Sequence, residues 1–304
     1  MPNPTNLLAV LAMSTSLVAC AEDAPPQPDL LALPGQAYYP ENVHADADGT
    51  LYVGSLTTGQ LVAFDDGKTE PRTVLAAGAH GVTGLTGVLV HDDELWACSI
   101  DTMFQRPTEV RSFTLDGAPK QTYVLGSQYF CNDLAFDDRG NLYVTDSFSG
   151  TVQKLTKGAT AFETFVEDPR FIPDTQGAFG LDGIVYTDGA LYINKLDTGE
   201  LYEVSLDRVV TEIVVSPPLA APDGMRALGD NTLLVIEGGA NRLSKLTVSG
   251  ATATSKPVAT DLDMPTGVAV TRGSAWVTEG QLGRLFAQPA QAPNLPFSVR
   301  RIEL

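Results

Sequence analysis

Residues 132–144 read NDLAFDDRGNLYV, and the rest of the chain is built on the pattern in this stretch. A polar residue precedes a short apolar strand, an Asp- and Gly-rich turn follows, and an apolar–aromatic–apolar triplet begins a second strand. Six copies are in register: ENVHADADGTLYV from Glu41, TGVLVHDDELWA from Thr86, NDLAFDDRGNLYV from Asn132, DGIVYTDGALYI from Asp182, DGMRALGDNTLLV from Asp223 and TGVAVTRGSAWV from Thr266. Successive starts lie 45, 46, 50, 41 and 43 residues apart, which indicates a repeat architecture.

The repeat predicts an all-β fold. Most copies are followed by another turn and strand, as in TTGQLVAF, FSGTVQKL, DTGELYEV and LGRLFA, so each unit is expected to be a meander of four antiparallel strands. Units of this size are the blades of β-propellers, and six blades would fill residues 34–304 as one closed domain. A two-sheet sandwich would not explain the period. Residues 30–33 and 298–304 are both candidates for the outer strand that closes the ring.

Composition excludes several classes of function. The chain of 304 residues is 43% hydrophobic and 18% charged, which is typical of a globular protein. Its net charge of −18 speaks against nucleic acid, because phosphate backbones attract the opposite charge. We expect a small-molecule ligand and a monomer.

The N-terminus is predicted to be a targeting segment. Residues 7–19 form an apolar run too short to cross a bilayer but suited to a signal peptide, and residues 17–20 resemble a bacterial lipobox. We therefore expect a signal peptide over 1–19, a lipidated Cys20 with a tether to residue 33, and a cell-envelope location. Plain secretion and a buried strand are the alternatives. The other cysteines, Cys98 and Cys131, either pair in an oxidising compartment or remain buried thiols.

The repeat brings its first residues together at one mouth of the central channel. In order, these are Glu41, Thr86, Asn132, Asp182, Asp223 and Thr266. Three carboxylates that face one another need a neutralising partner, and an all-oxygen set with an amide suits a hard divalent cation, with Ca²⁺ the natural fit. The alternative is that each side chain caps a strand end by hydrogen bonding.

The stretches NDLAFDDRGNLYVTDS (132–147), LDGIVYTDGALYINKLDTGELYEV (181–204) and PDGM (222–225) resemble the senescence marker protein, gluconolactonase and luciferin-regenerating-enzyme family. The resemblance implies a calcium-dependent six-bladed propeller that hydrolyses a lactone. It implies that Glu41, Asn132 and Asp223 are metal ligands and that Asp223 is also the general base. The match departs from the family at Asp182, where an Asn is usual, and at Phe130, where animal lactonases have a substrate-binding Arg. Phe130 therefore favours a more apolar lactone or ester.

Further residues are predicted around the mouth. Thr86, Thr266 and Phe130 are expected to contact substrate, as is Lys195, for which a solvated loop position is the alternative. Residues following each second strand should also lie near the mouth: Ser55, Ser99, Asp146, Lys195, Glu237 and Glu279. The long connections 99–109 and 167–179 carry four candidate lid residues, Met103, Phe104, Phe171 and Phe179. The rival to a hydrolase is a non-catalytic binding propeller whose metal is structural or absent.

Overall fold

In the first and third repeats, an aspartate organises the turn that folds the chain back on itself. Asp137 Oδ1 accepts hydrogen bonds from the backbone N–H groups of Arg139 and Asn141 at 2.9 and 2.8 Å, and Gly140 takes a φ of +78° between them. Asp46 accepts an equivalent pair in the first repeat. These tight turns make the first two strands of each repeat antiparallel.

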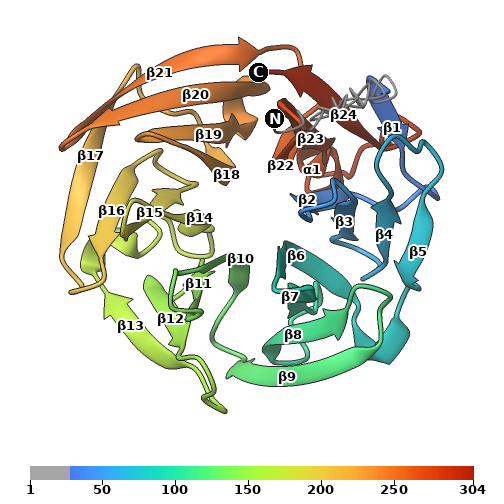
Figure 1. Cartoon of the computed structure of the whole chain (residues 1–304), viewed down its shortest axis with the longest axis horizontal. Helices are drawn as coiled ribbons and strands as arrows, with labels where there is room; N and C mark the ends of the chain where they lie inside the picture. Colours follow the sequence, from blue (N-terminus) through green and yellow to red (C-terminus); the bar gives the residue numbers. More distant parts are fainter. Residues whose placement is uncertain (1–27) are drawn as a thin grey trace, which may run out of the picture.

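The computed structural model of the chain describes residues 28–304 as an all-β propeller of mainly antiparallel strands (Figure 1). Over these residues, four sheets have four strands each and a fifth has eight. The first three four-stranded sheets are β2 (Pro40–Ala45), β3 (Leu51–Ser55), β4 (Leu61–Phe64) and β5 (Arg72–Leu75); β6 (Gly84–His91), β7 (Glu94–Ile100), β8 (Thr108–Thr114) and β9 (Pro119–Gly126); and β10 (Cys131–Phe136), β11 (Leu142–Asp146), β12 (Thr151–Leu155) and β13 (Glu163–Glu167).

The eight-stranded sheet consists of two antiparallel meanders. They are β14 (Leu181–Thr187), β15 (Ala190–Lys195), β16 (Leu201–Ser205) and β17 (Val210–Ser216), and β18 (Pro222–Gly229), β19 (Thr232–Glu237), β20 (Arg242–Ser249) and β21 (Thr252–Ala259). Their outer strands pair in parallel, with residues 214–216 of β17 opposite residues 252–254 of β21. The predicted all-β propeller is confirmed, but its sheets are not six separate units, because these two outer edges share hydrogen bonds.

The last four-stranded sheet joins the two ends of the described chain. It runs β22 (Pro265–Thr271), β23 (Ser274–Glu279), β24 (Ser298–Glu303) and β1 (Leu30–Ala32). Both candidate closing segments are therefore used, one as the third strand and the other as the outermost strand. The expectation of a strand in LGRLFA was wrong: residues 282–285 form the short helix α1 (Leu282–Leu285), and β24 takes the third position. Three 3₁₀ turns complete the elements, at Ala79–Gly81, Pro169–Phe171 and Gly238–Ala240.

The first strand of each repeat lies at the centre of the molecule. β2, β6, β10, β14, β18 and β22 contact one another in this order, and β22 returns to β2 (Figure 1). The apolar core lies between neighbouring sheets, as where Tyr52 and Leu61 of the first sheet pack with Leu85, Leu95 and Phe113 of the second. This arrangement places the start of every repeat at one end of the central axis.

The predicted signal peptide, its lipobox and Cys20 lie outside the described residues. Over residues 28–304, no helix has the length and apolarity needed to cross a membrane.

Candidate functional site

A β-bulge occurs at the same place in all six first strands. In each, two consecutive residues lie opposite a single residue of the second strand, which bends the strand and redirects its side chains. The bulged pairs are Glu41–Asn42, Thr86–Gly87, Asn132–Asp133, Asp182–Gly183, Asp223–Gly224 and Thr266–Gly267. The first residue of every pair is a predicted ring residue, and all six line one cavity of about 810 Å³.

Glycine at the second bulge position lets neighbouring strands approach closely. A Cβ on Gly183 would lie 2.4 Å from the carbonyl oxygen of Asp223, and one on Gly87 would lie 2.6 Å from that of Asn132. These distances are too short for any side chain, so the Thr-Gly and Asp-Gly dipeptides of the repeat are a packing requirement. The two exceptions, Asn42 and Asp133, instead project polar side chains that meet across the channel.

Glu41, Asn132, Asp182 and Asp223 form the floor of the cavity, and their side chains interact with one another. Asn132 Nδ2 donates to Asp182 Oδ2 at 2.9 Å and to Ser147 Oγ at 3.2 Å, and the Asp182 and Asp223 carboxyl groups are hydrogen-bonded to each other. A hydrogen bond between two carboxyl groups requires a shared proton. Glu41 Oε2 and Asp182 Oδ1 are buried and have no hydrogen-bond partner.

Burial dominates the electrostatics of this floor. It raises the pKa of Glu41 well above its ordinary value, and the nearby charges of Asp182 and Asp133 raise it further. Burial likewise raises the pKa of Asp182 to about 7, although hydrogen bonds from Asp223 and Asn132 favour its ionised form. The pKa of Asp223 is also raised, first by burial and then by Asp182 and Glu41. Without a cation, the floor therefore retains protons near neutral pH.

The donor chemistry of the floor fits a hard cation. Its donors are carboxylate and amide oxygens, and two buried carboxylate oxygens lack partners, as expected where a ligand is to be added. The side chains hydrogen-bond to one another, and within residues 28–304 no group of three or more His, Cys, Asp or Glu side chains is arranged to hold a metal ion. Metal binding would thus replace the carboxyl–carboxyl hydrogen bond between Asp182 and Asp223.

Beneath the floor, a buried ion pair closes the channel. Arg226 Nη1 lies 3.3 Å from Asp133 Oδ2, and Arg226 Nη2 donates to Asn42 Oδ1 at 3.0 Å and to Val43 O at 3.2 Å. Asn42 Nδ2 in turn donates to Asp133 Oδ1 at 3.1 Å. The positive charge of Arg226 lowers the pKa of Glu41 and so partly offsets the effect of its burial. Sequence analysis missed this network, although Asn42 and Asp133 stand out as the two non-glycine residues at the second bulge position.

The two ring threonines line the cavity, but their hydroxyl groups are already bonded. Thr86 Oγ1 donates to Cys131 O at 2.8 Å, and Thr266 Oγ1 donates to Pro40 O at 3.1 Å. Each bond joins a first strand to the first strand of the next repeat. The hydroxyl groups of Thr86 and Thr266 therefore bind the backbone, as the capping alternative predicts. Only their methyl groups are left to contact a ligand.

The cavity walls are apolar. Phe130, which is predicted to contact substrate, lines the cavity together with Leu56, Ile100, Phe104, Phe148, Phe179, Leu196, Met264, Leu282 and Phe286. Two of the predicted lid residues, Phe104 and Phe179, therefore lie on the walls. Phe171 is instead fully buried in the core against Tyr202, and Met103 is exposed outside the cavity lining.

The residues at the ends of the second strands, predicted to lie near the mouth, are not among the residues that line the cavity. Asp146 accepts hydrogen bonds from the backbone N–H groups of Phe130 and Phe148 at 2.8 and 3.1 Å. It therefore holds the backbone of these two cavity-lining phenylalanines in place. Glu237 and Glu279 each bind an arginine and a serine. The predicted substrate contact of Lys195 was wrong, because Lys195 Nζ lies 2.6 Å from Asp174 Oδ1 and 3.5 Å from Asp197 Oδ1, outside the cavity lining.

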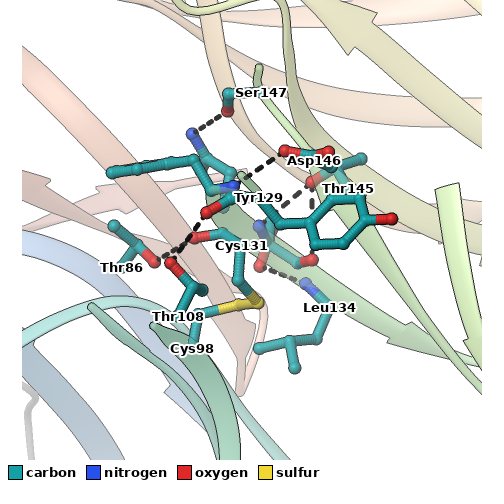
Figure 2. Close-up of a disulfide and its surroundings, with 12 residues drawn as sticks. Thr86, Cys98, Thr108, Tyr129, Cys131, Leu134, Thr145, Asp146 and Ser147 are labelled. Atoms are coloured by element: carbon teal, nitrogen blue, oxygen red, sulfur yellow. Dashed lines mark hydrogen bonds between the residues drawn. A yellow bond between two sulfur atoms is a disulfide. The ribbon is translucent and has the colours of Figure 1, made fainter. Parts of the chain in front are cut away.

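Cys98 of β7 and Cys131 of β10 form a disulfide, with their Cα atoms 5.5 Å apart (Figure 2). The bond links the second and third sheets directly beside Asn132. Figure 2 also shows the neighbouring hydrogen bond from Thr86 to the carbonyl oxygen of Cys131. The disulfide and this hydrogen bond both meet at Cys131, so together they fix the relative positions of the ring residues Thr86 and Asn132.

Comparisons with known proteins show the fold. A family model described as strictosidine synthase-like, N-terminal, matches residues 27–64. Virginiamycin B lyase from Staphylococcus aureus is 15% identical, with a TM-score of 0.62 over 90% of this chain and 98% of that one. The allergen Mala s 1 from Malassezia sympodialis is 12% identical, with a TM-score of 0.73 over 91% and 97%. The PQQ-bound aldose sugar dehydrogenase from Streptomyces coelicolor is 14% identical, with a TM-score of 0.63 over 92% and 99%. No curated protein matches in sequence.

Proposed function

We propose that this chain is a metal-dependent hydrolase of a lactone or related ester, with Ca²⁺ as the metal. The observation that carries the proposal is the pair of buried, unpartnered oxygens, Glu41 Oε2 and Asp182 Oδ1, at the floor of a large apolar cavity. Such a site combines a pocket of ligand size with a few convergent polar groups. The resemblance to the gluconolactonase-containing family supports the same activity, and we propose that the two halves of the eight-stranded sheet are the fourth and fifth blades of a six-bladed propeller.

The proposal assigns a role to each floor residue. Glu41, Asn132, Asp182 and Asp223 would hold the metal. A bound divalent cation would supply a Lewis acid for the ester carbonyl and a positive charge that keeps the floor carboxylates ionised. Asp223 would accept a proton from the attacking water, whose oxygen bonds to the acyl carbon. The acyl C–O bond then breaks, and the leaving oxygen takes up a proton to give a hydroxy acid or an alcohol and an acid.

Metal content tests this proposal before any substrate is known. We expect one equivalent of divalent metal in the wild-type protein after dialysis against calcium, measured by mass spectrometry. Glu41→Gln and Asp223→Asn remove floor carboxylates and should abolish it while the circular dichroism spectrum is kept. Ser255→Ala changes a buried hydroxyl group outside the cavity lining and serves as the control. A wild-type protein that takes up no metal would refute the metal site, and full hydrolysis by Asp223→Asn would refute its role as base.

A non-catalytic binding propeller is the second candidate. It is favoured by the hydrogen bonds from Asn132 to Asp182 and between Asp182 and Asp223, which satisfy part of the floor without a metal. Chelation separates the two functions. EDTA should abolish hydrolysis by a metal-dependent enzyme without melting the protein, whereas it should leave ligand binding by a metal-free propeller unchanged.

We also propose a lipid-anchored location at the bacterial cell envelope. The lipobox ending at Cys20 supports this, and the disulfide between Cys98 and Cys131 is consistent with an oxidising compartment. Metabolic labelling with radioactive palmitate should mark the wild-type protein and not Cys20→Ala. Unlabelled wild-type protein in the growth medium would instead indicate plain secretion.

A further inference from the structure

One side of the cavity is a continuous aromatic wall. The Phe130 ring centroid lies 4.9 Å from that of Phe179 and 5.1 Å from that of Phe148, which lies 5.4 Å from Phe179. Phe104 adds a fourth ring, 5.9 Å from Phe148 and 6.2 Å from Phe130. These residues come from four different connections, so the wall is assembled by the fold and not by one local motif. Ring distances in this range are those of favourable aromatic packing.

Phe104, at the mouth end of this wall, is exposed to solvent on a braced loop. Phe104 is 59% exposed and takes a φ of +53°, an unfavourable conformation for a bulky residue. Its loop is braced by Asp101, whose carboxylate accepts the backbone N–H groups of Met103 and Gln105 at 3.1 Å each. Arg106 also anchors the loop, donating to Gly81 O at 2.9 Å. A strained and braced backbone that presents an exposed ring indicates a functional position.

The opposite side of the cavity is also apolar. Met264, Leu282 and Phe286 line it, and Phe286 is 58% exposed at the end of α1. The cavity thus has an exposed phenylalanine in each of two separate rim segments.

In the absence of metal, the side chains that line the cavity disfavour an anionic ligand. The charged residues that line it are Glu41, Asp182 and Asp223, and its lining in the described chain contains no Lys, Arg or His. The nearby Arg226 is committed to Asp133 and Asn42 beneath the floor. In the protein without metal, a carboxylate or phosphate placed here would have no cationic side chain as a partner.

From these observations we infer that the ligand is an uncharged ester or lactone that bears an aromatic ring. Its ring packs against Phe104, Phe130, Phe148 and Phe179, and its carbonyl group points to the floor acids. The reactive part of this inference rests on the proposed function, whereas the preference for an uncharged aromatic ligand rests on the walls.

Binding measured without metal tests the inference. The full chain in EDTA is titrated by calorimetry with dihydrocoumarin, an uncharged aryl lactone, and with δ-valerolactone, which has the same lactone ring without the aryl group. Glucono-δ-lactone and the hydrolysis product 3-(2-hydroxyphenyl)propanoate complete the series. We expect dihydrocoumarin to bind at least about tenfold more tightly than each of the others, since burying a benzene ring is worth that factor.

Variants locate the binding to the aromatic wall. Phe104→Ala and, on the opposite side, Phe286→Ala should each weaken dihydrocoumarin binding several-fold, and both positions are exposed enough that folding should survive. Val124→Ala on β9, where the side chain is 61% exposed outside the cavity lining, is the matched control and should bind as the wild type does. Phe104→Lys should narrow the discrimination against the anionic product.

The outcomes separate this inference from the proposed function. Equal or tighter binding of glucono-δ-lactone, or unchanged binding by both phenylalanine variants, would overturn the assignment of an aromatic ligand even if the protein hydrolyses another lactone. Dihydrocoumarin that binds as expected but is not hydrolysed with any divalent metal would support the ligand class and refute the hydrolase.

Discussion

Replacing Arg226 by methionine should destabilise the protein severely, because it leaves a buried charge without its partner. Arg226 is 8% exposed and Asp133 is 1% exposed, so neither group can be solvated in place of the other. The substitution removes the contact to Asp133 Oδ2 and also the donors to Asn42 Oδ1 and Val43 O. Methionine fills much of the same volume, so the loss reports electrostatics and not a cavity.

The expected magnitude follows from the environment of Asp133. Removing one partner of a buried ion pair costs about 3–5 kcal/mol, a large share of the about 5–15 kcal/mol by which domains are stable. In the double variant Arg226→Met, Asp133→Asn the buried charge is gone, and the amide oxygen can still accept from Asn42 Nδ2 and the backbone N–H of Leu134. We therefore expect the double variant to recover about half of the loss or more.

Urea-induced unfolding, followed by circular dichroism for the wild type, Arg226→Met, Asp133→Asn and the double variant, gives the four free energies of a double-mutant cycle. A coupling energy of about 2 kcal/mol or more supports the reasoning. A loss below about 1 kcal/mol in Arg226→Met, or equal losses in the single and double variants, would show that the ion pair does not stabilise the fold as argued.

Three further predictions concern the scaffold around the site. Burial opposes ionisation of Glu237, but hydrogen bonds from an arginine, a serine and a backbone N–H lower its pKa overall, so the ionised group stabilises the fold above its unfolded pKa. Urea titrations should show that Glu237→Gln has a free energy of unfolding about 1–3 kcal/mol below that of the wild type at pH 7. This difference should disappear as the pH falls through the folded pKa. Cys98→Ser opens a loop with a sequence separation of 33 and should cost about 2–4 kcal/mol in thermal unfolding, with no further loss on adding reductant. In Gly183→Ala the new Cβ would lie 2.4 Å from Asp223 O, so calorimetry should show a loss of about 1–3 kcal/mol, whereas Gly238→Ala, with no contact below 3.4 Å, should be nearly neutral.

The ring at the mouth could be predicted because one geometric feature repeats. The first strand, turn and second strand keep nearly constant length, so equivalent residues of all six copies fall at equivalent places in space. The sequence did not reveal the β-bulge itself. It did reveal the repeated polar residue, which in four of the six copies is followed by the glycine that the bulge requires. Asp182 and Asp223 are 41 residues apart in sequence and hydrogen-bonded in space for this reason.

The predictions that were wrong concern features that the repeat pattern does not determine. Lys195, Glu237 and Glu279 occupy one register position, yet the repeat does not specify which way a strand-end side chain turns. Glu237 and Glu279 pair with arginines of the neighbouring third strands, and Lys195 pairs with an aspartate of a connecting segment. The joined outer strands β17 and β21 depend on how two meanders tilt toward each other, which no local pattern encodes. The role of Arg226 could not be predicted from its own repeat, because its partners Asn42 and Asp133 lie in β2 and β10.

The layer formed by Asn42, Asp133 and Arg226 has a consequence for how the site works. The cavity above it and the one at the opposite end of the channel, which Arg226 itself lines, share no lining residue. A ligand must therefore enter and leave through the mouth, past the exposed rings of Phe104 and Phe286. This single path, with aromatic side chains at its entrance, suits the uncharged aromatic ligand proposed above. The same layer also places the positive charge of Arg226 near Glu41, where it lowers the pKa of Glu41 and partly offsets the effect of burial.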